Sequence, residues 1–117
     1  ITHPKICAHL LGQIIKAFGV DHILFGTDSI WWGSPQWQIE ALRRFQIPED
    51  MQEKFGYAPI SDKDKSKILG LNAAKLYDVN VEDRRQQIIT DRMTQLKEVY
   101  LAEGGKPSNN VYGWIMS

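Results

Sequence analysis

Residues 23–29 read Ile-Leu-Phe-Gly-Thr-Asp-Ser and place a carboxylate just after the clearest apolar run of the chain. Asp28 lies three residues after Phe25, and Gly26 lets the backbone between them turn or be approached closely. A carboxylate held at such a point can bind a divalent metal or take a proton from a metal-bound water. It can equally well cap a turn, so the spacing by itself leaves both roles open.

The loop that begins at Asp28 contains three further residues of interest, Ser29, Trp31 and Trp32. Aromatic side chains beside a catalytic group suit an apolar or ring-bearing substrate. The two tryptophans can instead cover an edge of the fold or a subunit contact. Both interpretations remain open.

Helices are expected on both sides of this segment. Pro4 fits the start of a helix, apolar residues recur at helical spacing as far as Phe18, and Gly19 is a good helix stop. Residues 23–25, Ile-Leu-Phe, form a β-prone apolar run between turn residues, which is typical of a strand that is buried on both faces. The chain is thus predicted to be mostly α-helical, with one buried strand at about 22–26 and with further helices near 35–45, 48–56, 61–69, 71–77 and 90–102.

Three local signals define the later helices. Ser61 and Asp64 form a capping box that opens one helix, and Gly70 is expected to break it. Residues 78–89 are expected to be a polar connection. The helix at 90–102 is expected to bury one apolar side, made of Met93, Leu96, Tyr100 and Leu101.

A single strand raises a structural difficulty, because its backbone N–H and C=O groups would have no partner. A helix, a buried strand, a loop and a helix form the repeat unit of an α/β fold. Strands from a second copy can complete a sheet, which leaves a homo-oligomer open. Alternatively, the chain is the end of a larger α/β domain, and its start at Ile1 rather than at a methionine favours this second interpretation.

Composition narrows the class of protein. The chain has 117 residues, the length of one domain, with 43% hydrophobic and 24% charged residues. Lys and Arg number 14 and Asp and Glu number 14, so no overall charge attracts nucleic acid or an anionic membrane. No apolar stretch approaches the roughly 20 residues that span a bilayer. The single cysteine, Cys7, excludes an internal disulfide and favours a cytoplasmic protein.

Two motifs resemble those of one enzyme family. The segment DHILFGTDS, residues 21–29, resembles the last-strand motif of the amidohydrolase superfamily, in particular its amidohydrolase-related (amidohydrolase 2) branch. The segment ILGLNAAKLY, residues 68–77, is similar to the C-terminal helix pair of the same branch. Their order and separation also match, and the resemblance covers about residues 5–79.

The resemblance implies a (β/α)8 TIM barrel with a metal centre at the carboxyl ends of its strands. Residues 4–18 would be the seventh barrel helix and residues 22–26 the eighth strand. Asp28 would correspond to the last-strand aspartate, which in many members is a metal ligand and helps to activate the attacking water. The metal would be divalent, with zinc the commonest in the family, and in a barrel Ser29, Trp31 and Trp32 would border a small-molecule substrate.

The sequence also departs from the family pattern. The His-x-His of the first strand and the ligand histidines of the middle strands are absent. The chain has three histidines, His3, His9 and His22, and none is expected to be a ligand. The metal centre therefore cannot be rebuilt from this chain alone, which by itself is expected to bind no metal and to be inactive.

These observations predict an α/β protein of which this chain is the C-terminal fragment of a TIM barrel. Residues 1–79 would be the barrel part and residues 80–117 a C-terminal helical extension and tail. The parent would be a metal-dependent hydrolase that cleaves an amide, ester or lactone bond by metal-activated water. Two alternatives stay open, namely a decarboxylase (a lyase) of the same barrel branch and a non-catalytic helical interaction module.

Overall fold

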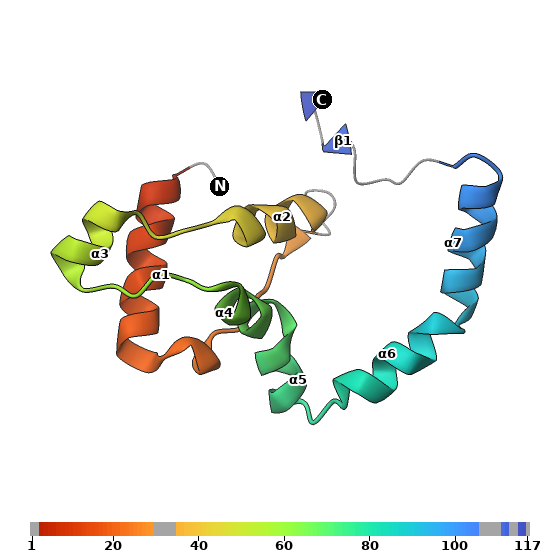
Figure 1. Cartoon of the computed structure of the whole chain (residues 1–117), viewed down its shortest axis with the longest axis horizontal. Helices are drawn as coiled ribbons and strands as arrows, with labels where there is room; N and C mark the ends of the chain where they lie inside the picture. Colours follow the sequence, from red (N-terminus) through yellow and green to blue (C-terminus); the bar gives the residue numbers. More distant parts are fainter. Residues whose placement is uncertain (1–2, 30–34, 106–110, 113–114, 117) are drawn as a thin grey trace.

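The structure is a computed structural model that describes residues 3–29, 35–105, 111–112 and 115–116. Its elements, in chain order, are α1 (Pro4–Phe18), the 3-10 turn η1 (Val20–His22), α2 (Gln36–Arg44), α3 (Glu49–Phe55), α4 (Asp62–Ser66), the π-helical turn η3 (Lys67–Leu71), α5 (Asn72–Leu76), α6 (Val81–Ile89) and α7 (Arg92–Ala102) (Figure 1). Two short strands follow, β1 (Val111–Tyr112) and β2 (Ile115–Met116), paired antiparallel. Among the described residues, no helix combines the length and apolar character that crossing a membrane requires.

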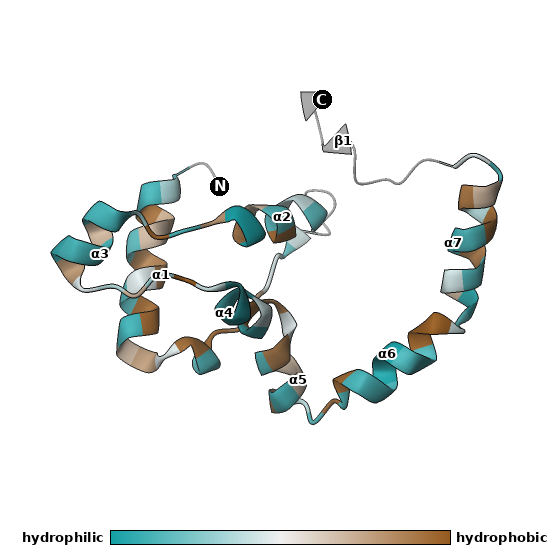
Figure 2. Ribbon diagram, viewed as in Figure 1, coloured by the Kyte–Doolittle hydropathy of each residue, from teal (hydrophilic) through white to brown (hydrophobic). Residues whose placement is uncertain are grey.

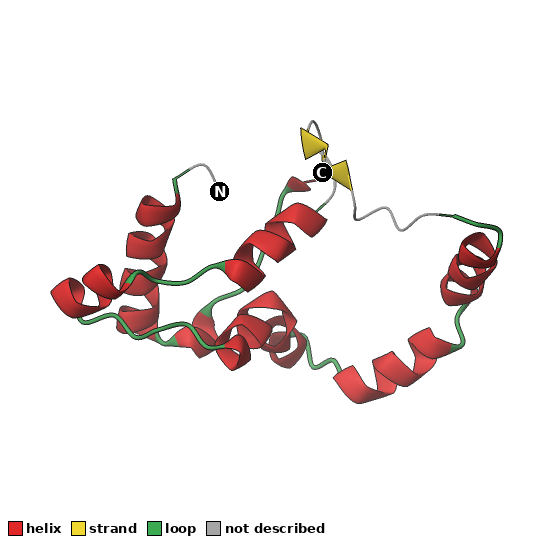
Figure 3. Ribbon diagram, turned by 45° about the horizontal axis from the view of Figure 1, so that its top comes forward, coloured by secondary structure: helices red, strands yellow, loops and turns green. Residues whose placement is uncertain are grey.

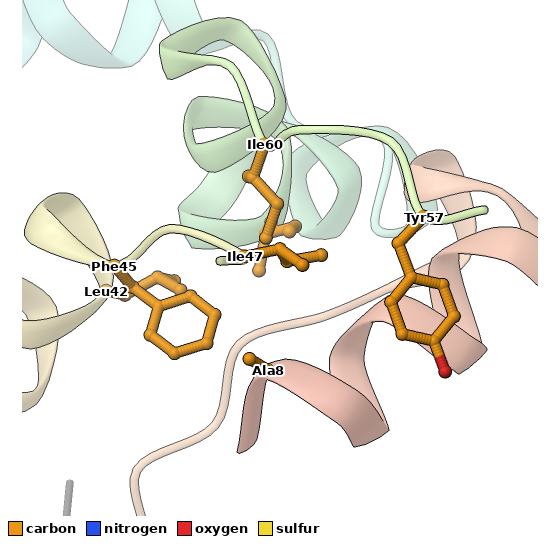
Figure 4. Packing of buried hydrophobic residues seen from close by; sticks show 7 residues of the cluster. Ala8, Leu42, Phe45, Ile47, Tyr57 and Ile60 are labelled. Atoms are coloured by element: carbon orange, nitrogen blue, oxygen red, sulfur yellow. The ribbon is translucent and has the colours of Figure 1, made fainter. Parts of the chain in front are cut away.

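Helices α1 to α5 gather into one cluster, whereas α6 and α7 continue away from it as an arm (Figures 1 and 3). The radius of gyration is 17.3 Å, compared with about 13 Å for a compact domain of this length. The buried hydrophobic residues all belong to the cluster: Ala8, Leu42, Phe45, Ile47, Tyr57, Ile60 and Ile68 (Figure 4). Most of this core comes from the connections between helices, because Phe45, Ile47, Tyr57 and Ile60 lie outside any helix.

The expected helix boundaries are confirmed where proline and glycine set them. Helix α1 begins at Pro4, whose missing N–H costs nothing in a first helical turn, and it ends before Gly19 at φ 80°. Helix α3 follows Pro48 and ends at Gly56, which adopts the left-handed conformation that a glycine reaches without steric cost. The capping box of Ser61 and Asp64 is also present, with each side chain accepting from the backbone N–H of the other.

The predicted buried strand at 22–26 is not confirmed. His22 ends the 3-10 turn η1, and residues 23–28 run without strand pairing. Exposure alternates along this segment: Ile23 and Phe25 pack against the core, whereas Leu24 is 47% exposed. The reason is that the helical cluster covers one face only, and the described part of the chain offers no neighbouring strand for the other.

Three further expectations about the later helices are wrong. Gly70 does not break the chain's helical course, because the π-helical turn η3 carries it directly into α5. Residues 78–89 are not merely a polar connection, since Asn80 caps α6 by accepting from the N–H groups of Glu82 and Asp83.

Helix α7 has no buried side: Met93 is 70% exposed and Tyr100 53%. The hydropathy colouring shows several apolar stretches along this arm, which extends away from the helical cluster (Figure 2).

Helix α1 and the chain after α3 make a close contact at Gly12. A methyl group built on Gly12 would lie 2.5 Å from Cδ2 of the Tyr57 ring. The Tyr57 hydroxyl shares a hydrogen bond of 2.9 Å with Nδ1 of His9, one turn earlier in the same helix. This contact holds the loop that supplies Tyr57 and Ile60 to the core against α1.

Replacing this glycine tests the packing. Gly12→Ala is expected to lower the free energy of unfolding by about 1–3 kcal/mol, because the Tyr57 ring must move. Gly70→Ala is the matched control: no atom lies within 4 Å of its added methyl, so the unfolding free energy should not fall by a comparable amount. Chemical denaturation of both variants measures the difference. Equal effects would contradict the proposed close packing.

The capping box predicts an acid-sensitive contribution to stability. The hydroxyl and N–H of Ser61 donate to Asp64 and lower the pKa of its carboxyl below the ordinary value of 3.8. A lowered pKa in the folded state means that the contribution is full above pH 4 and is lost as pH falls through that lowered value. Ser61→Ala should reduce stability at pH 7 by about 1 kcal/mol and flatten the pH dependence below pH 4. Thermal unfolding between pH 2.5 and 7 tests this, and an unchanged slope would contradict it.

Candidate functional site

Asp28 lies at the end of the extended segment, and its side chain is exposed. Its backbone has φ 47°, in the left-handed region that aspartate and asparagine enter more readily than most residues. Within the described part of the chain, its carboxylate makes no hydrogen bond or ion pair. A carboxylate on a strained turn with no internal partner is free to bind a cation or accept a proton.

The turn around Asp28 is held by its two neighbours. The hydroxyls of Thr27 and Ser29 share a hydrogen bond of 2.9 Å, and the Ser29 N–H donates to the Thr27 hydroxyl at 3.3 Å. Gln38 of α2 donates its amide to the Thr27 carbonyl at 3.4 Å. Ser29 is only 2% exposed, so its observed contact supports the turn, and contact with a substrate remains a prediction.

The two tryptophans predicted to bind substrate, Trp31 and Trp32, lie outside the described residues. The structure therefore brings together only Asp28 and Ser29 among the predicted site residues. The catalytic and metal-binding roles of Asp28 remain predictions as well.

The two sequence motifs are in direct contact. Lys67, the residue just before the second motif, forms an ion pair of 2.6 Å with Asp21 of the first, between η3 and η1. The hydrogen bond from Lys67 is the main cause that holds the pKa of the Asp21 carboxyl below its ordinary value. The N–H of Phe25 donates to the carbonyl of Ile68 at 3.1 Å. The second motif thus packs along the segment that leads to Asp28.

A buried amide makes the most specific link between the motifs. Asn72 is 8% exposed, and its side-chain nitrogen donates to the carbonyls of Val20 and Ile23, each at 2.8 Å. Sequence reasoning missed this residue. A signal was present, because Asn72 is the one polar residue in the run from Ile68 to Ala74, and a polar residue buried in such a run needs hydrogen-bond partners.

The described residues do not make a metal centre. No group of three or more His, Cys, Asp or Glu side chains lies close enough together in this part of the chain to hold an ion. His9 bonds to Tyr57 and its ring packs 4.7 Å from that of Phe55, which gives it a structural role. Asp28 alone supplies fewer ligands than a divalent metal requires. The chain therefore fits a metal only as one contributor to a centre completed by other residues.

Comparisons with known proteins now bear on these contacts. A sequence model of the family described as Amidohydrolase matches residues 3–79, which is most of the chain and includes both motifs. Searches of curated proteins and of solved structures find no match to this chain. Members of the matched family generally use divalent metals. With a match of this extent, which includes both motifs, the chain belongs to the amidohydrolase family.

Proposed function

We propose that this chain is the C-terminal part of a metal-dependent hydrolase whose complete fold is a (β/α)8 barrel. The parent would act on a small molecule and cleave an amide, ester or lactone bond by metal-activated water. The observation that carries the proposal is the placement of Asp28: it is exposed, has no partner among described residues, and ends a segment held by the second family motif.

Uncovered apolar surface supports the larger barrel. Helix α1 exposes Ile6, Leu10, Ile14 and Phe18, at 44–68%, along one stripe of side chains four residues apart. An apolar hollow of about 320 Å³ lies beside it, lined by Cys7, Leu10, Leu11, Ile14, Leu42 and Phe45. Monomeric proteins rarely leave a contiguous apolar face of this kind in water. Neighbouring barrel helices would cover this stripe, and a neighbouring strand would cover Leu24.

We assign to Asp28 one ligand position in a divalent metal centre, with zinc as the proposed metal. The remaining ligands would come from strands that the described residues do not include, so the geometry supports no further step of the reaction. What the chain itself supplies is an exposed carboxylate on a turn that is held by the hydrogen bond between Thr27 and the buried Ser29. Trp31 and Trp32 follow this turn in sequence and are proposed to border the substrate. The small cysteine content, one residue, supports a cytoplasmic protein.

Substitution of Asp28 in the full-length protein tests the assignment. Asp28→Asn keeps the size of the side chain and tolerates the left-handed backbone, but it removes the negative charge. We expect metal content to fall and turnover to drop by about a hundredfold or more, since a metal ligand is lost. Elemental analysis and assays on amide, ester and lactone substrates provide the measurements, and carbon dioxide release from aromatic acids separates a decarboxylase from a hydrolase.

Asp78→Asn is the matched control for this substitution. Asp78 is also an exposed aspartate with a left-handed backbone, at φ 52°, and it lies after α5, beyond both motifs. Its replacement should leave metal content and turnover unchanged. If Asp28→Asn behaves in the same way as this control, Asp28 does not belong to the active site.

A second candidate function is favoured by the exposed arm. Helix α6 leaves Ile89 69% exposed, and α7 exposes Met93, Leu96 and Val99 at 49–70%. These side chains are suited to contact a partner, as in a non-catalytic helical interaction module.

The behaviour of the 117-residue chain on its own discriminates between the two candidates. A barrel part separated from its neighbours should aggregate or lose fixed side-chain packing, because the α1 stripe and the extended segment are uncovered. Light scattering and near-ultraviolet circular dichroism measure this. A stable, cooperatively folding dimer that binds no zinc would instead support the interaction module.

A further inference from the structure

The 3-10 turn η1 (Val20–His22) leads into residues 23–28, which run without strand pairing. The carbonyl groups of this segment need partners, because a buried backbone group without a hydrogen bond destabilises a fold. The side-chain amide of Asn72 carries two N–H donors, which allows one residue to bond two carbonyls. It does so here, with Val20 and Ile23 at 2.8 Å each.

The π-helical turn η3 supplies a hydrogen-bond acceptor to the same segment, whereas the Asn72 side chain supplies donors. The backbone N–H of Asn72 donates to the carbonyl of Lys67, five residues back, rather than to Ile68, four residues back. The Ile68 carbonyl accepts the N–H of Phe25 at 3.1 Å. A π-helical turn inserts one extra residue into a helix and often occurs at a functional site. Here it presents a backbone acceptor to the segment that carries Asp28.

We propose that Asn72 is a positioning residue, which together with the π-helical turn holds residues 20–25 and so sets where Asp28 stands. The contacts lie on the face of the segment that packs on the helical cluster, and they leave the side with Leu24 and Asp28 open. This inference rests on the proposed function in one respect, that Asp28 is the group whose position matters. We call the three hydrogen bonds that hold residues 20–25 the clamp: Asn72 to Val20, Asn72 to Ile23, and Phe25 to Ile68. The existence of the clamp does not depend on the proposed function.

Two substitutions at Asn72 in the full-length protein test the clamp. Asn72→Leu removes both donors at similar size, and Asn72→Asp replaces them with a carboxylate facing two carbonyl oxygens. Hydrogen–deuterium exchange with mass spectrometry would follow peptides covering residues 20–28 and, for comparison, residues 8–15 of α1. We expect the protection of residues 20–28 to fall about tenfold or more in both variants at pH 7, with a much smaller change in α1.

The pH dependence of exchange protection in the Asn72 variants shows whether the hydrogen-bond donors of residue 72 position the segment or whether the substitutions only destabilise the whole fold. Burial between carbonyls raises the pKa of the introduced aspartate, so its protonated form, which can donate one hydrogen bond, is favoured below that pKa. Protection in Asn72→Asp should therefore recover on acidification and be lost again as pH rises, whereas Asn72→Leu should show no recovery. Asn80→Leu, which removes an asparagine cap at α6, should leave residues 20–28 unaffected.

Two results would overturn the inference. One is protection of residues 20–28 that stays within threefold of the wild type in both Asn72 variants. The other is an equal loss of protection in residues 20–28 and 8–15, which would make Asn72 a residue for stability alone. Asp28→Asn leaves the clamp intact. Unchanged turnover in that variant, alongside the expected exchange pattern at Asn72, would thus reject the proposed function and still support the clamp.

Discussion

An extended backbone needs hydrogen-bond partners, and in the described part of this chain no strand provides them for the residues that follow the 3-10 turn η1. Helical parts meet the need instead: the Asn72 side chain bonds two carbonyls, and Ile68 accepts one N–H. The remaining contacts of the segment follow from this arrangement. The ion pair of Asp21 with Lys67 adds a link at its start, and the packing of Ile23 and Phe25 places its apolar side chains on the core.

Local chemistry made much of the fold predictable. The boundaries of α1 and α3 and the capping box at α4 depend on residues that act on their own backbone, such as Pro4, Gly56 and Ser61. The strand at 22–26 could not be predicted in the same way, because an apolar run acquires strand pairing only from a neighbour. The lack of a buried side in α7 is likewise a matter of tertiary contacts, since the apolar spacing of Met93 and Leu96 is present in the sequence whether or not a partner covers it.

The candidate site was predictable to a similar degree. The position of Asp28 after an apolar run and the two family motifs can be read from the sequence, whereas the contact between the motifs cannot. Asn72 and the π-helical turn were not identified, because their role depends on carbonyls some fifty residues away in the chain. The prediction that Gly70 ends a helix failed for a physical reason. Glycine weakens an α-helix, but here the π-helical turn η3, which is wider than an α-helical turn, continues directly into α5.

One face of the extended segment packs against the helical cluster, and the other face is exposed. The contacts that hold the segment come mainly from the second motif, with additions from Lys67 and Gln38, and all of them lie within this chain. Leu24 and Asp28, in contrast, face away from these contacts and are exposed. A carboxylate with no internal partner gains a function only when other groups converge on it. The position of Asp28 is thus a property of this chain, whereas its chemistry depends on residues that meet it from the open side.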